Sequence, residues 1–123
     1  MKIIFCIGET LKERRQKKTN QILKKQIEKG LKSIKNKSKI IIAYEPVWSI
    51  GTGVIPKEAD LNKTISFIKS RFVKKYPKIL YGGSVNANNL SVLKKIPNID
   101  GFLIGGASQN PKKFIDIIKK TIN

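Results

Sequence analysis

The sequence predicts an α/β fold built from four βα units with parallel strands. Four short apolar runs rich in β-branched residues alternate along the chain with segments of helical periodicity. The runs are continuously apolar, as expected for a parallel sheet that is covered on both faces. Each run ends in a loop that contains glycine or proline, and loops at this end of a parallel sheet commonly carry the chemistry.

The first two units occupy the first 72 residues or so. Residues 2–7 form an apolar run that predicts the first strand, and about residues 10–35 form a helix with one apolar stripe. Residues 39–44 predict the second strand, and a loop rich in glycine and proline extends to Pro56. Proline suits the first turn of the next helix, whose apolar stripe runs from Leu61 to Phe72.

The last two units repeat this order on a shorter scale. Residues 79–81 predict the third strand, followed by a short helix near 88–95. Residues 99–104 predict the fourth strand and residues 111–122 the last helix. The chain of 123 residues is expected to form one domain, 1–123. With the helices on one face of the sheet, strand residues are expected to line the other. They are Ile3, Phe5, Ile40, Ile42, Leu80 and Phe102, or their neighbours.

Charge and composition exclude several functions. The chain has 26 lysines and arginines against 8 acidic residues, a net charge of +18. Only three of the basic residues are arginines, and no aromatic residues are interleaved as stacking platforms. We therefore interpret the charge as a solvated surface on the outer helix faces, with polyanion binding as the alternative and nucleic acid an improbable partner. The lysines assigned to those faces include Lys24, Lys74, Lys75, Lys112 and Lys113.

Absent residue types narrow the chemistry further. The sequence has no histidine, so histidine-based triads and histidine-ligated metals are excluded, and no metal site is predicted. The single cysteine, Cys6, cannot form an internal disulfide, which fits a cytoplasmic protein. No apolar run reaches the length of a membrane span, and the first residues do not form a secretory signal, so no membrane partner is expected.

Two kinds of loop are candidates for function. Glu45 ends a buried strand, where burial would favour a proton-accepting role, and residues 46–53 after it have the make-up of a lid. Taken alone, a carboxylate in an ordinary loop is the more common explanation. The pairs Gly82-Gly83 and Gly105-Gly106 follow successive strands, and such glycines let backbone N–H groups approach an anion.

Together these segments resemble the C-terminal half of the triosephosphate isomerase family. The resemblance runs nearly end to end and covers the fifth to eighth strands of a (β/α)₈ TIM barrel, so the fold class implied is half of such a barrel. It rests on four segments in the family's order and spacing: residues 5–11 with Glu13 and Arg14, residues 43–53, residues 79–85 with Asn89, and residues 100–108. Four such matches override the objection to Glu45 as an isolated carboxylate.

The resemblance implies a reaction and a role for each site residue. The family interconverts dihydroxyacetone phosphate and glyceraldehyde 3-phosphate, in glycolysis and gluconeogenesis, without a cofactor. Glu45 would be the base that shuttles the proton. Residues that would hold the substrate phosphate are Gly51, Ser84, Gly105 and Gly106. Residues that would form the lid and its latch are Pro46, Trp48, Gly53, Tyr81 and Glu9, with Trp48 placing its indole between Tyr44 and Glu9.

Departures from the family pattern leave alternatives open. Strands one to four of the barrel are absent, together with the family's catalytic lysine and histidine, so the isolated chain is predicted to be inactive or nearly so. A separate N-terminal half chain, self-association or marginal folding are the possible outcomes. The chain is a split gene product, a truncated reading frame or a remnant, and the rival function is a non-catalytic subunit that binds phosphate or polyanions. Within the matched segments, Ser49 stands where alanine is usual, Gln109 where an apolar residue is common, and the lid exit at 54–56 is shortened.

Overall fold

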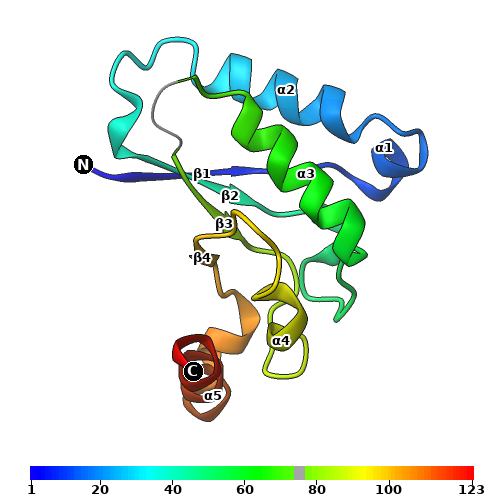
Figure 1. Ribbon diagram of the computed structural model, residues 1–123, viewed down its shortest axis with the longest axis vertical. Coiled ribbons are helices and arrows are strands. Elements are labelled where there is room, and N and C mark those ends of the chain that lie inside the picture. Colours follow the sequence, from blue (N-terminus) through cyan, green and yellow to red (C-terminus); the bar gives the residue numbers. More distant parts are fainter. Residues whose placement is uncertain (74–76) are drawn as a thin grey trace.

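A computed structural model of the chain describes residues 1–73 and 77–123. Four parallel strands form one sheet in the order β1-β2-β3-β4, so each strand pairs with the next one along the chain (Figure 1). The strands are β1 (Ile3–Ile7), β2 (Ile40–Tyr44), β3 (Lys78–Tyr81) and β4 (Gly101–Phe102). The helices are α1 (Leu11–Arg15), α2 (Thr19–Gly30), α3 (Glu58–Ser70), α4 (Leu90–Leu93) and α5 (Pro111–Ile122). This architecture confirms the predicted α/β class and is consistent with half of a (β/α)₈ barrel.

The hydrophobic core lies between the sheet and helices α2 and α3, which run side by side along it (Figure 1). The parallel register aligns Ile7 with Tyr44 and Tyr44 with Tyr81, and all three side chains are buried. The helices contribute the apolar stripes that the sequence predicts; their buried residues include Leu23 and Ile27 of α2 and Leu61, Ile65 and Ile68 of α3. Helix α5 lies beside α4, and both helices extend the same core, α4 with Leu90 and Leu93 and α5 with Ile117.

Of the six strand residues named for the face away from the helices, only Leu80 lies on it, and neighbours of the named residues line the rest of that face. Ile40 and Ile42 belong to the buried core, and Phe5 packs against Gly30 of α2. Ile3 is in register with Ile40, and Phe102 is in register with Tyr81, so their side chains lie on that same face. Because side chains alternate along a strand, the opposite face carries the residues between them: Ile4, Cys6, Ile41, Ala43 and Leu80. Ile4 is 47% exposed, and Cys6 is exposed as well.

The helix predicted over residues 10–35 is two helices. Thr10 and Glu13 form a capping box that starts α1, and the chain turns at Lys17, whose φ is +56°. Helix α2 then runs only to Gly30, so Leu31 and Ile34 follow it in a turn. The apolar stripe identifies α2 correctly. It begins only at Ile22, so it gives no signal for the break between α1 and α2, which lies before that residue.

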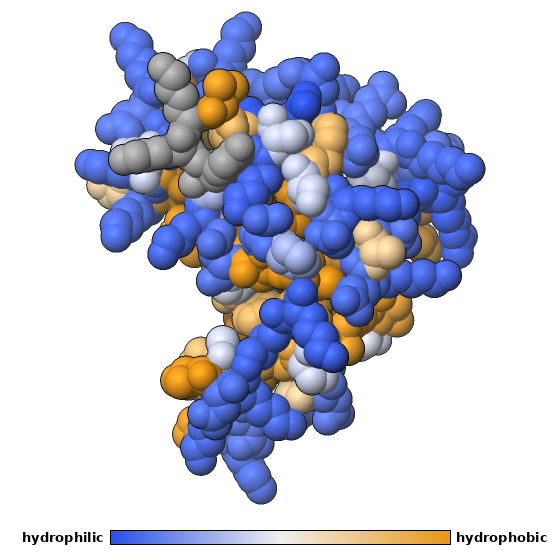
Figure 2. Space-filling view, viewed as in Figure 1, coloured by the Kyte–Doolittle hydropathy of each residue, from blue (hydrophilic) through white to orange (hydrophobic). Residues whose placement is uncertain are grey.

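On the face shown in Figure 2, hydrophilic side chains predominate and apolar ones are gathered where the sheet layer meets α5. Lys24 and Lys112 are exposed as expected, whereas the lysines predicted at positions 74 and 75 lie outside the described residues. Among the described helices, none combines the length and apolar character needed to cross a membrane.

Candidate active site

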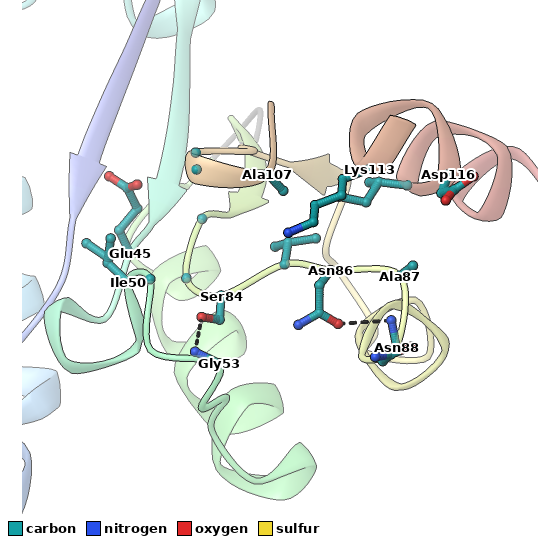
Figure 3. A pocket seen from close by; sticks show the side chains of 17 residues that line it. Glu45, Ile50, Gly53, Ser84, Asn86, Ala87, Asn88, Ala107, Lys113 and Asp116 are labelled. Atoms are coloured by element: carbon teal, nitrogen blue, oxygen red, sulfur yellow. Dashed lines mark hydrogen bonds between the residues drawn. The ribbon is translucent and has the colours of Figure 1, made fainter. Parts of the chain in front are cut away.

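A cavity of about 600 Å³ opens at the C-terminal ends of the strands (Figure 3). Six of the predicted site residues line it: Glu45, Gly51, Gly53, Ser84, Gly105 and Gly106. They come from the loops after β2, β3 and β4, which the parallel sheet places at one edge. The remaining candidates, Pro46, Trp48, Tyr81 and Glu9, do not line the cavity.

The position of Glu45 depends on two glycines that are distant in the sequence. Its backbone N–H donates to the carbonyl oxygen of Ile7 at 2.8 Å, which continues the pairing of β1 with β2. A Cβ atom at Gly8 would lie 1.8 Å from the carbonyl oxygen of Glu45, and one at Gly82 would lie 2.6 Å from its Cγ. Gly8 and Gly82 therefore make room for the backbone and the side chain of Glu45, respectively.

The thiol of Cys6 lies beside the Glu45 carboxylate. Burial, a hydrogen bond with Glu45 and the negative charge of Glu45 raise the pKa of Cys6 from 9.0 to about 11. Cys6 is nevertheless an exposed residue, on the sheet face opposite the helices. This combination of an accessible but protonated thiol next to the candidate base gives a chemical probe of the site.

We expect Cys6 to react slowly with iodoacetamide at pH 8. A pKa of about 11 leaves about a hundredfold less thiolate than the ordinary value, and the higher nucleophilicity of a more basic thiolate offsets about tenfold of this. The folded chain should therefore be alkylated about tenfold more slowly than the urea-unfolded chain. Glu45→Gln should accelerate the reaction, whereas Glu58→Gln, in the first turn of α3, should not. Equal rates in all samples would place Glu45 away from the thiol.

The glycines at the far side of the cavity are not required by packing. A Cβ atom added to Gly51, Gly105 or Gly106 would meet no atom within 4 Å, although the φ of +68° at Gly51 itself favours glycine. Within residues 1–73 and 77–123, the backbone N–H groups of these three glycines have no acceptor. Unpaired N–H groups that face open space are suited to bind an anion.

Lys113 is exposed, as predicted for an outer helix face, but it also lines the cavity, which the sequence did not predict. It lies in the first turn of α5 and lines the cavity. Figure 3 shows its side chain extending from α5 across the cavity toward the loop that carries Ser84 and Asn86. In the described part of the chain its ammonium group forms no salt bridge. Its place in the sequence could have predicted this position, because Lys113 follows the Gly105-Gly106 loop closely and the first turn of a helix lies next to the loop before it.

Behind the cavity, a buried carboxylate fixes the indole of Trp48. Glu9 is 0% exposed and accepts hydrogen bonds from the hydroxyl of Tyr44 at 3.1 Å and from Nε1 of Trp48 at 3.3 Å. Arg14 lies 3.4 Å from the same carboxylate and stacks 4.6 Å from the centre of the Trp48 ring. Burial, together with the charge of Glu9, raises the pKa of Tyr44 above its ordinary range, so Tyr44 remains a donor.

Residues 46–54, which we call the lid, are fastened to the loop after β3. The backbone N–H of Gly53 donates to Oγ of Ser84 at 2.8 Å, the bond drawn in Figure 3. Tyr81 reaches the lid differently: its hydroxyl lies 3.0 Å from Oγ of Ser49. The Ser49 side chain is therefore part of the fastening. The sequence showed Ser49 only as a departure from a family pattern.

Comparison with known proteins identifies the same relationship. A family model described as triosephosphate isomerase matches residues 1–121. Proteins named triosephosphate isomerase are similar over 97% of this chain in Thermodesulfovibrio yellowstonii (45% identical), 99% in Candida albicans (42%) and 94% in Mycoplasma mobile (47%). The chain covers 51%, 52% and 48% of these relatives. It thus spans about half the length of the curated relatives that it matches.

Proposed function

Because the chain belongs to the triosephosphate isomerase family, we propose that it supplies the base and the phosphate-binding loops of an isomerase active site. The reaction would interconvert dihydroxyacetone phosphate and glyceraldehyde 3-phosphate in the cytoplasm. One observation carries this proposal: a carboxylate and three glycines with unpaired N–H groups line the same cavity. The chain covers about half of its relatives, so the proposal has a second part: the other four βα units of the barrel are needed to complete the site.

In this proposal, Glu45 removes a proton from the carbon that bears the substrate hydroxyl next to the carbonyl. It returns the proton to the neighbouring carbon, while the hydroxyl proton of the substrate passes to the former carbonyl oxygen, so the carboxylate is regenerated and no other reactant is consumed. Negative charge develops on the carbonyl oxygen during the transfer and needs a positioned donor or cation. The sequence contains no histidine, so we assign this electrophilic role to the complementary half of the barrel.

The chain alone is expected to bind inorganic phosphate weakly, with amide chemical-shift changes at Gly51, Gly105 and Gly106. These donors belong to local loops and need little from another chain. Lys113→Ala should weaken the binding about fivefold, the effect of removing an exposed charge partner worth about 1 kcal/mol. Titration of phosphate into the ¹⁵N-labelled chain measures both effects.

Lys112→Ala is the matched control, because Lys112 is the preceding exposed lysine of α5 and does not line the cavity. Equal weakening by both substitutions would assign the effect to general surface charge. Shifts spread over the lysines and missing at the three glycines would instead favour the second candidate function, a non-catalytic chain that binds polyanions. The net charge of +18 is the observation that favours that alternative.

A further inference from the structure

The side chain of Ser49 connects the middle of the lid to its end, to the end of β3 and to the loop after β3. Ser49 is 0% exposed and lies in the middle of the lid. Its Oγ contacts the carbonyl oxygen of Val54 at the lid exit, the hydroxyl of Tyr81 at the end of β3 and the backbone N–H of Ser84. Its own carbonyl oxygen accepts a hydrogen bond from Oγ of Ser84 at 2.8 Å.

The hydrogen bonds of the Ser49 hydroxyl can be assigned a direction. A serine hydroxyl has one proton and two acceptor sites. The carbonyl oxygen of Val54 can only accept, so the proton of Ser49 goes there. The backbone N–H of Ser84 can only donate, at 3.2 Å, and Tyr81 must then donate at 3.0 Å. Burial raises the pKa of Tyr81, which keeps this donor protonated, and the Ser49 hydroxyl is fully used.

The two serines close a ring with the lid. Gly53 donates to Ser84, Ser84 donates through its hydroxyl to the Ser49 carbonyl and through its N–H to the Ser49 hydroxyl. Gly83 leaves the space for this arrangement, since a Cβ atom there would lie 2.2 Å from the hydroxyl oxygen of Tyr81 and 2.6 Å from Oγ of Ser49. Every bond of the ring joins atoms of the chain itself, so the ring stabilises the lid in this position whether or not an anion occupies the cavity.

We propose that Ser49 is a positioning residue whose hydroxyl holds the lid closed over the cavity independently of phosphate. It acts on the lid and on Ser84, and it touches no reacting atom. Alanine at this position would leave the donors of Tyr81 and Ser84 and the acceptor of Val54 without their common partner. Buried polar groups without a partner are costly, so a Ser49→Ala lid would open unless phosphate bound to its N–H groups stabilised the closed form.

Hydrogen exchange of the Gly53 amide in the full chain tests this proposal. Without phosphate, Ser49→Ala should exchange at Gly53 about tenfold faster than the unmodified chain, which corresponds to losing one to two net hydrogen bonds. Saturating inorganic phosphate should slow the exchange markedly in Ser49→Ala and little in the unmodified chain. Tyr81→Phe, which removes one of the three bonds, should show a smaller effect in the same direction.

Thr64→Val is the matched control, because Thr64 is a buried hydroxyl bonded to Asp60 within α3 and away from the lid. Exchange at Ile65, in the core of α3, reports whether each variant is folded. Equal Gly53 exchange in folded Ser49→Ala, Tyr81→Phe and unmodified chains would overturn the proposal. The phosphate-dependent part rests on the proposed function; if phosphate shifts no glycine amide, that function fails, while the comparison without phosphate still decides the role of Ser49.

Discussion

Glu45→Gln is expected to lower the isomerase turnover of a reconstituted barrel about a thousandfold. A positioned general base contributes a factor of about 10²–10⁴ to proton transfer, and glutamine cannot accept the proton. The complementary chain can be the N-terminal half of a relative such as the Thermodesulfovibrio yellowstonii protein, of which this chain matches 51%. A coupled assay of the mixed chains with dihydroxyacetone phosphate measures the rate.

Two controls make this result specific. Glu58→Gln changes an exposed carboxylate of α3 and should leave the rate unchanged. The chain without a partner should show negligible turnover, because losing members of a catalytic set commonly costs factors of hundreds or more. If Glu45→Gln kept a tenth of the rate, Glu45 would not be the base. If the chain alone came within tenfold of the mixture, the need for a second half would be refuted.

The second large effect concerns association: without a partner, the chain is expected to form larger species as salt increases. The sheet face opposite the helices carries Ile4, Ile41 and Leu80, and Ile4 alone is 47% exposed. Full burial of one such side chain is worth about 1.5–3 kcal/mol, so a few of them match a good part of the roughly 5–15 kcal/mol stability of a domain. The charge of +18 opposes association, and salt screens it.

Sedimentation velocity at low and moderate salt measures this association. The double substitution Ile4→Lys and Ile41→Lys should suppress the larger species, because it places charge on the open face. Val73→Lys is the control, since Val73 is 91% exposed but precedes β3 and lies outside that face. A compact monomer at every salt concentration would show that the open face does not drive self-association.

The sequence predicted those parts of the fold that depend on local pattern. The β-branched run of β2 and the apolar stripe of α3 specify their elements because burial on one side suffices to form them. The fourth strand, predicted over 99–104, pairs with β3 only at Gly101–Phe102, and an apolar run carries no signal for where its pairing begins and ends. The sequence did not decide which of two neighbouring strand residues faces the helices, because a continuously apolar strand shows no alternation: residues 40, 41 and 42 are all isoleucine.

The residues of the candidate site also fall into those that the sequence predicted and those that it did not. Glu45 and the glycines of the cavity belong to segments that resemble a family, so their presence and order were predictable. The role of Ser49 was not, because it depends on partners up to 35 positions away and on the direction of each hydrogen bond. Lys113 was hidden among many surface lysines, and only the placement of α5 against the loops shows that its side chain reaches the cavity.

The brevity of β4 links anion affinity to local unfolding. Only two residues of β4 are in register with β3, flanked by single bonds from the backbone N–H groups of Asp100 and Leu103. If Gly105 and Gly106 bind an anion as proposed, undocking of β4 would separate them from the rest of the site, and the apparent dissociation constant would equal the intrinsic one divided by the docked fraction. By reciprocity, an anion stabilises docking as much as docking stabilises anion binding. A strand added to the edge of β4 that no described strand covers would therefore act as an effector of the cavity without touching the anion.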